Sequence, residues 1–157
     1  MKGFTLIELM VVIAMIAILA LLAVPNMQNR LVREQIVEAV RLADIAKAPI
    51  ATRWTQDHTL PLDNVGAGLP VAEKIVSNHV KSLTIEGGAI HLTFGNQASA
   101  ALSGKTLTLR PAIVEDAPVV PVAWVCGHAR PPDQMSVQGT NRTDVEKNFL
   151  PLNCRAG

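Results

Sequence analysis

The chain has 157 residues, enough for one domain with a real core or for one domain and an appendage. Its charge is balanced, with 14 Lys and Arg against 13 Asp and Glu, and the basic residues are scattered from Arg30 to Arg155. It has no Tyr, three Phe and two Trp, so platforms for stacking bases or sugars are scarce. These numbers argue against nucleic acid as the main partner and predict an aliphatic core.

Residues 4–24 form an apolar run in which Glu8 is the one charged residue. At about 1.5 Å per residue a helix of this length spans roughly 31 Å, which matches the hydrocarbon core of a bilayer. A cleaved secretory signal peptide would have a cationic start and an uninterrupted apolar run, whereas only Lys2 precedes this run and Glu8 interrupts it. A helix of a soluble core needs only an apolar stripe. A membrane-spanning helix is therefore predicted.

After Pro25 the pattern becomes amphipathic, with apolar residues three to five positions apart and opposite charges at helical spacing, as far as about Trp54. Pro25 is expected to kink the helix, and Pro49 to bend it again or end it. The helix 4–54 would be about 75 Å long, against a radius of gyration of about 15 Å for the globular part. Its apolar half is expected to protrude into a bilayer or into the centre of an assembly of like chains.

A loop rich in Pro and Gly is predicted at 55–81, followed by an antiparallel sheet at 82–126. The strands are expected at 82–86, 89–94, 105–110 and 119–125. Gly87 and Gly88 should turn the first hairpin, and three prolines are expected at strand ends: Pro111, Pro118 and Pro121. The inner face should pack on the helix through one set of side chains or their alternates: Leu83, Ile85, Ile90, Leu92, Leu107, Leu109, Val122 and Trp124.

The C-terminal segment 127–157 has little secondary-structure signal and follows the first of two cysteines, Cys126 and Cys154. Their spacing favours one disulfide over a metal site, and an oxidising compartment would pair them; two reduced structural cysteines are the alternative. Closing this loop would contribute about 3 to 4 kcal/mol. The triplet that starts at Asn141 matches a glycosylation sequon and is expected to be an ordinary turn.

No arrangement in the sequence predicts catalysis. Of the four histidines, only His58 has a possible metal ligand beside it, Asp57, and adjacent loop residues are more often solvated than ligating. Cys126 and His128 are poorly placed as a thiol and its base, and a disulfide would consume the thiol. No catalytic motif is present. The other two histidines, His79 and His91, have no such neighbour. We therefore predict no enzyme, no metal site and no cofactor.

The segment GFTLIEL, the apolar run, Pro25 and the polar helix together resemble the class III signal of type IV pilins. Downstream, NHVKSLTIEGGAIHLTFG, SGKTLTLRPAI, VAWVCG and FLPLNCR are similar to the sheet strands and C-terminal loop of type IVa major pilins, so the resemblance covers nearly the whole chain. It implies an α+β pilin fold: a long N-terminal helix whose amphipathic half packs on a four-stranded antiparallel sheet, with a disulfide-closed C-terminal loop.

The resemblance also implies roles for single residues. Residues 1–3 would be a short prepilin leader, cut after Gly3 by a membrane peptidase that then N-methylates Phe4. A lone carboxylate in hydrocarbon needs a partner, and the family pairs it with the N-terminus of a neighbouring subunit, which assigns Glu8 to assembly. Thr5 could add a hydrogen bond to it. Pro25 would mark the helix kink, and the two cysteines the disulfide.

The function implied is a structural subunit that polymerises through its N-terminal helix into a surface filament, for adhesion, twitching motility, DNA uptake or phage reception. Its partners would be further copies of itself, the prepilin peptidase and N-methyltransferase, the inner-membrane assembly machinery and the outer-membrane secretin. Before assembly it would sit in the inner membrane with Lys2 in the cytoplasm and the globular part in the periplasm. After assembly it would be extracellular.

Two alternatives stay open on the sequence. A type II secretion pseudopilin usually lacks the C-terminal disulfide and carries a calcium-binding loop, so Cys126, Cys154 and the absence of an acidic cluster favour the pilus. A minor pilin that binds DNA or a receptor would concentrate its basic residues on one strip, whereas here they are scattered. The abundance of the subunit in sheared filaments would separate these functions.

Overall fold

The computed structural model describes residues 3–156, with only the backbone described for residues 24–26. Met1 and Lys2, two residues of the predicted leader, therefore lie outside the described residues. The chain divides into two compact units, Met1–Leu31 and Val32–Gly157. The first unit holds the whole apolar run, and the second holds the rest of the helix together with the sheet.

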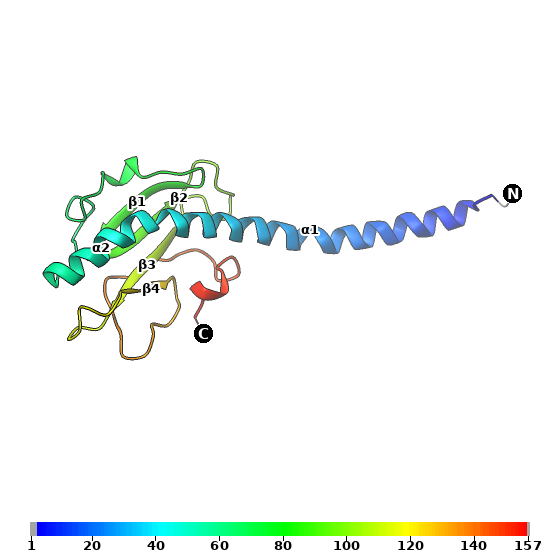
Figure 1. The fold of residues 1–157 in the computed structure, drawn as a ribbon. Coiled ribbons are helices and arrows are strands. Elements are labelled where there is room, and N and C mark those ends of the chain that lie inside the picture. The colour runs from blue at the N-terminus through cyan, green and yellow to red at the C-terminus, as the bar shows by residue number, and fades with distance from the viewer. Residues whose placement is uncertain (1–2, 157) are drawn as a thin grey trace. The chain divides into compact units, whose positions relative to one another are not determined.

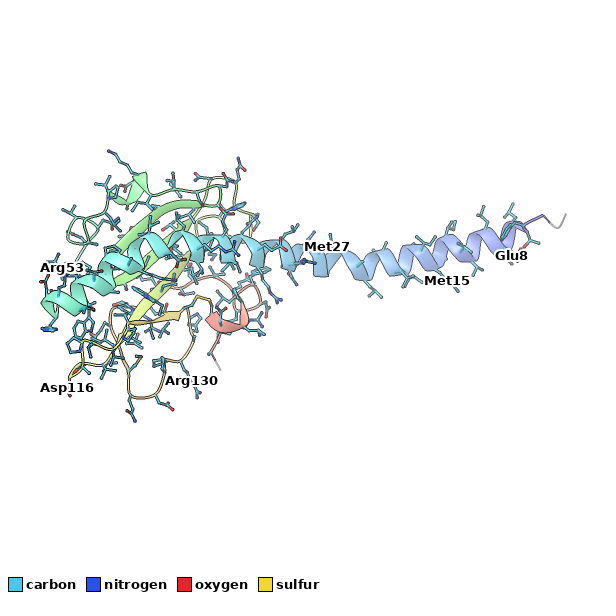
Figure 2. The ribbon with its side chains drawn as sticks, viewed as in Figure 1. Glu8, Met15, Met27, Arg53, Asp116 and Arg130 are labelled. Atoms are coloured by element: carbon cyan, nitrogen blue, oxygen red, sulfur yellow. A yellow bond between two sulfur atoms is a disulfide. The ribbon has the colours of Figure 1, made fainter. Side chains whose placement is uncertain are left out.

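In the first unit, helix α1 (Leu6–Leu42) begins two residues after Phe4. Every side chain from Phe4 to Ala23 is exposed to solvent in the single chain, as the sticks in Figure 2 show along this part of α1. An 18-residue window of the helix has a mean hydropathy of 3.0, so by length and composition it can cross a membrane. The helix includes Pro25, and the kink predicted there stays a prediction.

In the second unit, one residue interrupts the helix: α1 ends at Leu42 and α2 (Asp44–Asp57) follows after Ala43. Helical bonding continues across the interruption, since the N–H of Lys47 donates to the carbonyl oxygen of Ala43 at 3.1 Å. Pro49 lies inside α2 and does not end it. The helix ends at Asp57, three residues beyond the predicted Trp54, and the residue that follows, His58, is in the left-handed conformation.

The helix buries one narrow stripe against the sheet, which Figure 1 shows behind the helix. Its members are three or four residues apart and so share one helix face: Val32, Ile36, Ala39, Ala43, Ala46 and Ile50. Six of the side chains predicted for the inner face of the sheet are buried here: Leu83, Ile85, Ile90, Leu92, Leu107 and Leu109. Val122, predicted with them, is only partly buried and lies outside the strands. Trp124 is partly buried at the margin of this core.

The sheet has five strands instead of the predicted four. Four run antiparallel in the order of the chain: β1 (Val80–Glu86), β2 (Ala89–Phe94), β3 (Thr106–Ile113) and β4 (Ala123–Cys126). β5 (Ser136–Val137) pairs with the end of β3. The first hairpin turns at Gly87 and Gly88 as predicted, and both have positive φ, which a two-residue turn of this kind requires.

The prediction that Pro111 would end a strand was wrong, because β3 continues to Ile113. The carbonyl oxygen of Pro111 accepts the N–H of Gln138 at 2.9 Å, so the polar groups of Pro111 face the side of β3 where β5 pairs. β2 pairs with β3 only as far as Leu109. The missing N–H of the proline therefore falls beyond the last pair between β2 and β3 and costs no bond to β2; toward residue 138, Pro111 accepts a bond that it cannot return.

Regular structure is sparse at the two ends of the sheet. The loop before it contains a short 3-10 helix, η1 (Ala72–Lys74), and the C-terminal segment contains β5 and η2 (Leu152–Cys154). The predicted disulfide is present: it joins Cys126 at the end of β4 to Cys154, and both are buried. Gly127 has a φ of 54°, and a Cβ there would lie 2.7 Å from the carbonyl oxygen of Cys154, so only glycine fits this turn.

Candidate functional site

The first turn of α1 is closed by Thr5 and Glu8, near the end of the helix where Figure 2 labels Glu8. Thr5 directly precedes the helix, and its backbone N–H and its hydroxyl both donate to Oε2 of Glu8, at 3.1 and 2.9 Å. In return the N–H of Glu8 donates to Oγ1 of Thr5 at 3.3 Å. This reciprocal arrangement is a capping box, in which the side chains at both ends of the turn bond to each other's backbone.

The cap has a particular value in an apolar segment. The first N–H groups of a helix have no partner within it, and a bilayer offers no water to replace one. Thr5 and Glu8 satisfy two of these groups with their own side chains. The same carboxylate is the only charged group among the described residues before position 24 and is exposed in the single chain. Glu8 therefore combines a local structural role with a charge that is open to an outside partner.

Gly3 and Phe4, the predicted cleavage site, precede α1 and belong to no helix or strand. The side chain of Phe4 is 87% exposed. These two residues together with Thr5 and Glu8 form one continuous stretch in the first unit. The two cysteines, which are also predicted site residues, are joined in the second unit. The remaining predicted site residue, Pro25, has only its backbone described.

A polar cluster lies on the sheet face turned away from the helix. His91 on β2 stands opposite Thr108 on β3, and both are buried. Nδ1 of His91 is 2.9 Å from Oγ1 of Thr108, which also accepts the N–H of Arg142 at 3.0 Å. The guanidinium of Arg142 pairs with Glu86 at 2.7 Å. The cluster thus fixes the C-terminal segment to the outer face of the sheet.

This cluster predicts how stability depends on pH. Burial, followed by the positive charge of Arg142, lowers the pKa of His91, while Glu86 acts in the opposite direction. The unfolded chain takes up a proton near the ordinary histidine pKa of about 6.5, whereas the folded chain resists it. The contribution of His91 to the free energy of unfolding is therefore complete above that pH and is lost as pH falls through the lower pKa of the folded state.

We expect the midpoint temperature of thermal unfolding of the full-length protein in detergent to decrease as the pH is lowered from about 7 to about 5. His91→Gln should reduce this pH dependence. The matched control is His58→Asn, since His58 is exposed and asparagine tolerates its left-handed backbone. Circular dichroism at several pH values measures the effect. Equal pH slopes for the wild type and His91→Gln would contradict the assignment to His91.

Asn64, in the loop before the sheet, is a buried polar residue that the sequence did not single out. Its side-chain oxygen accepts the N–H of Ile85 at 2.7 Å, and its amide nitrogen donates to the carbonyl oxygens of Leu83 at 2.9 Å and Pro70 at 3.1 Å. All three bonds reach the backbone. This one side chain therefore ties the loop to the middle of β1.

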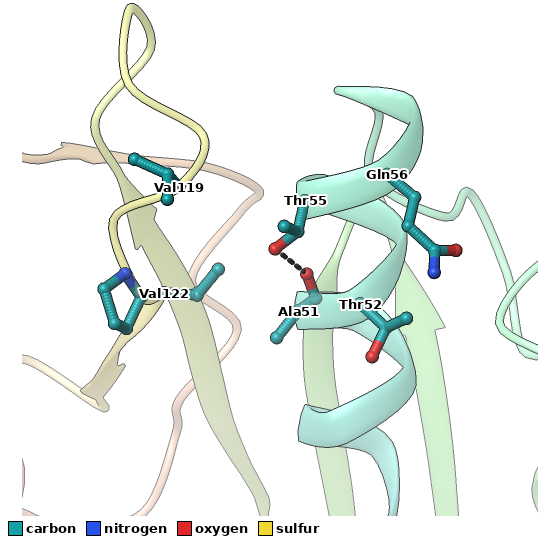
Figure 3. A pocket seen from close by; sticks show the side chains of 7 residues that line it. Ala51, Thr52, Thr55, Gln56, Val119 and Val122 are labelled. Atoms are coloured by element: carbon teal, nitrogen blue, oxygen red, sulfur yellow. Dashed lines mark hydrogen bonds between the residues drawn. The ribbon is translucent and has the colours of Figure 1, made fainter.

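One surface groove of the second unit is lined without titratable side chains. Figure 3 shows this groove, of about 440 Å³, between α2 and residues 119–122, where the hydroxyl of Thr55 donates to the carbonyl oxygen of Ala51 at 3.0 Å. No lining residue is titratable: Ala51, Thr52, Thr55, Gln56, Val119, Pro121 and Val122. Within residues 3–156, no three His, Cys, Asp or Glu side chains are grouped to hold a metal ion.

Asn141, the asparagine of the sequon, is half-buried, and its side chain forms hydrogen bonds within the fold. Its side-chain oxygen accepts the N–H of Thr143 at 3.1 Å, and its amide nitrogen donates to the carbonyl oxygen of Gly127 at 2.9 Å. An asparagine that bonds its own backbone two residues on forms a local turn. The expectation that the sequon is an ordinary turn stays a prediction.

Comparison with known proteins gives matches along nearly the whole chain. The family model of the pilin, a bacterial filament protein, matches residues 32–155, and the prokaryotic N-terminal methylation motif matches residues 1–24. The type IV major pilin protein PilE of Neisseria gonorrhoeae is 32% identical over 160 residues, which cover 98% of this chain and 93% of PilE. Fimbrial protein EcpC of Eikenella corrodens is 32% identical (98% and 90% covered), and the major fimbrial protein FimA of Dichelobacter nodosus 29% (98% and 96%).

Proposed function

The chain belongs to the pilin family, and from this premise we propose how it is processed, anchored and assembled. It is a structural subunit of a type IV pilus and not an enzyme. Its precursor is anchored in a membrane through the apolar helix, is processed by a prepilin peptidase and polymerises with its own copies into an extracellular filament. The single observation that carries this function is the methylation motif in front of a pilin domain on one chain.

For processing, we assign cleavage to the bond between Gly3 and Phe4 and N-methylation to Phe4. Residues 1–3 are then the leader. The absence of helix and strand at Gly3 and Phe4 supports this assignment, because a peptidase needs the backbone in an accessible form. The capping box survives the cut, since its N–H donor belongs to Thr5, which is still an amide when Phe4 is the first residue.

For assembly, we assign residues 4–24 to the filament core and Glu8 to axial registration. The new amine of Phe4 on one subunit is a counter-charge of the right sign for Glu8 on the next. Thr5 holds the carboxylate in position at the head of the helix until that amine replaces it as partner. A kink at Pro25 would adjust the direction of the helix where it leaves the core.

For localisation, we assign the precursor to the inner membrane, with the globular part in the periplasm. The disulfide between Cys126 and Cys154 supports a compartment that is oxidising. Growth from that position requires inner-membrane assembly proteins and a secretin in the outer membrane. We also propose the partition into helix 4–54, loop 55–81, sheet 82–126 and C-terminal loop 127–157 as a division of roles; the regular structure itself runs on to Asp57 in the helix and begins at Val80 in the sheet.

The test is the composition of filaments sheared from cells that express this protein. We expect the chain to be their most abundant protein and its first residue to be N-methylated Phe4, as measured by mass spectrometry. A pseudopilin would stay in the cell envelope, and a minor subunit would be a small fraction of the filament. Filaments that lack the chain, or a chain that still begins with Met1, would contradict the assignment.

A further inference from the structure

The outer edge of β1 is closed by a side chain instead of a strand. β1 pairs with β2 on one side, so its other edge would present free backbone groups. In the middle of this edge, the amide of Asn64 accepts from the N–H of Ile85 and donates to the carbonyl oxygen of Leu83. A residue of a neighbouring parallel strand makes the same two bonds. Asn64 therefore imitates one residue of an added strand.

Both ends of this edge are covered by the backbone of adjoining loops. The N–H groups of Gly87 and Gly88, just beyond β1, donate to the carbonyl oxygens of Leu62 and Pro61 at 3.2 and 2.9 Å. At the start of β1, the carbonyl oxygen of Val80 accepts from the backbone of residue 77 at 3.0 Å. Between these ends, the hydrogen bonds to this edge among the described residues come from the Asn64 side chain, so the closure of the strand centre depends on it.

Asn64 is also held firmly in this position. It is only 6% exposed, and its third bond, to the carbonyl oxygen of Pro70, uses the remaining N–H of its amide. Replacing the side chain would leave the N–H of Ile85 and the carbonyl oxygen of Leu83 without these bonds. Such groups bind the nearest available backbone or water.

We propose that Asn64 prevents a second copy of this chain from adding a strand at the edge of β1. Copies of a polymerising subunit meet at high local concentration, so an open edge would meet the same edge on a neighbour. β1 has Lys81 near its start and Glu86 at its end, and an antiparallel approach of two copies would bring these opposite charges together. With this edge closed, copies of the chain associate through their N-terminal helices and not through β1.

The experiment compares full-length Asn64→Ala with Asn141→Ala, both purified as monomers in detergent. Asn141 is the matched control because its side chain also bonds backbone groups, away from β1. At temperatures equally far below each unfolding midpoint, we expect Asn64→Ala to associate at least about tenfold faster, since only this variant frees an edge. Light scattering measures the rate, and infrared absorption detects β-sheet formed between molecules.

Amide hydrogen exchange identifies the site of association. In monomeric Asn64→Ala the N–H of Ile85 should exchange at least about tenfold faster than in the wild type, and in the associated material it should be protected again. Association no faster than for Asn141→Ala, or without protection at Ile85, would overturn the proposal. If Asn64→Ala does not fold, Asn64→Asp decides by its association rate against Asn141→Ala alone, because aspartate keeps the acceptor for Ile85 and loses the donors to Leu83 and Pro70. The measurement uses monomers, so its outcome is separate from filament formation.

Discussion

Cells that carry Glu8→Val are expected to hold a processed, membrane-anchored subunit and almost no filaments. Glu8 is the only charged side chain among the described residues before position 24, so no other side chain of this segment can meet the amine of a neighbour's Phe4. Without it, that amine would be buried unpaired in the filament core. We expect the filament yield per cell to fall to about a tenth of the wild-type value or less.

The capping box allows the charge of Glu8 to be separated from its role in the helix. Glu8→Gln keeps a side-chain oxygen that can accept the two Thr5 bonds but has no charge. If the charge sets the register, Gln should fail as Val does; if the cap is what matters, Gln should restore filaments. Thr5→Ser keeps the hydroxyl and serves as the control with filaments intact.

The measurement is the amount of processed protein in the membrane fraction and in sheared filaments, compared by immunoblotting. Wild-type amounts of Glu8→Val filaments would rule out registration by the carboxylate. A membrane fraction that contains only uncut precursor would place the defect at the peptidase, and would also contradict a role confined to assembly.

The second large effect is expected from Cys126→Ser, which should prevent filaments from accumulating. The disulfide closes a segment with a sequence separation of 28, and beyond Cys126 the described chain has only β5 and η2 as regular elements. Losing the closure should lower the free energy of unfolding by about 2 to 5 kcal/mol. The loosened segment would then be open to proteolysis before assembly.

The remaining contacts of the C-terminal segment set a limit to this effect. Arg33 and Arg155 both donate to the carbonyl oxygen of Asn148, at 2.9 and 3.0 Å, and the N–H of His128 donates to the carbonyl oxygen of Cys154 at 3.0 Å. These bonds can hold the segment only while the sheet end and the tail stay close together. We therefore expect them to slow the loss of structure and not to prevent it.

The control for the disulfide is the double variant Cys126→Ala and Cys154→Ala, which removes the bridge without leaving a free thiol. It should behave like Cys126→Ser in chemical denaturation and in filament yield. A normal yield from the double variant alone would trace the defect to the unpaired Cys154. Normal filaments and an unchanged denaturation midpoint in both would show that the bridge is dispensable.

The sequence predicted the elements whose signal is local. Alternating residues around Gly87 and Gly88 predicted the first hairpin, and the helical period predicted an amphipathic helix as far as about Trp54. The period did not predict which of the apolar side chains are buried, since Met27 and Leu31 share it and are exposed. The pattern Thr5-x-x-Glu8 in front of an apolar run is the sequence signature of a capping box. The sequence analysis predicted a hydrogen bond between the side chains of these two residues. The structure adds a second bond in the opposite direction, from the backbone N–H of Glu8 to the hydroxyl oxygen of Thr5.

Features that depend on distant partners could not be predicted. Asn64 stands among turn residues, and its partners in β1 are 19 and 21 positions away, so its role has no local pattern. β5 has two residues, too few to show an alternation. The extension of β3 past Pro111 depends on where β2 ends, which is a fact of the sheet and not of the strand.

The stripe between Val32 and Ile50 also decides how the subunit carries mechanical load. If the N-terminal helices form the filament core as proposed, tension along the filament passes through the helices, whereas a load applied at its surface pulls on the sheet. For the two to slide apart, Ile36 and Ile50 must leave their close-packed neighbours together, and the contact of 2.6 Å between Glu38 and His79 must break. Pulling along the axis therefore loads the whole stripe in shear, the direction in which many small contacts resist at once.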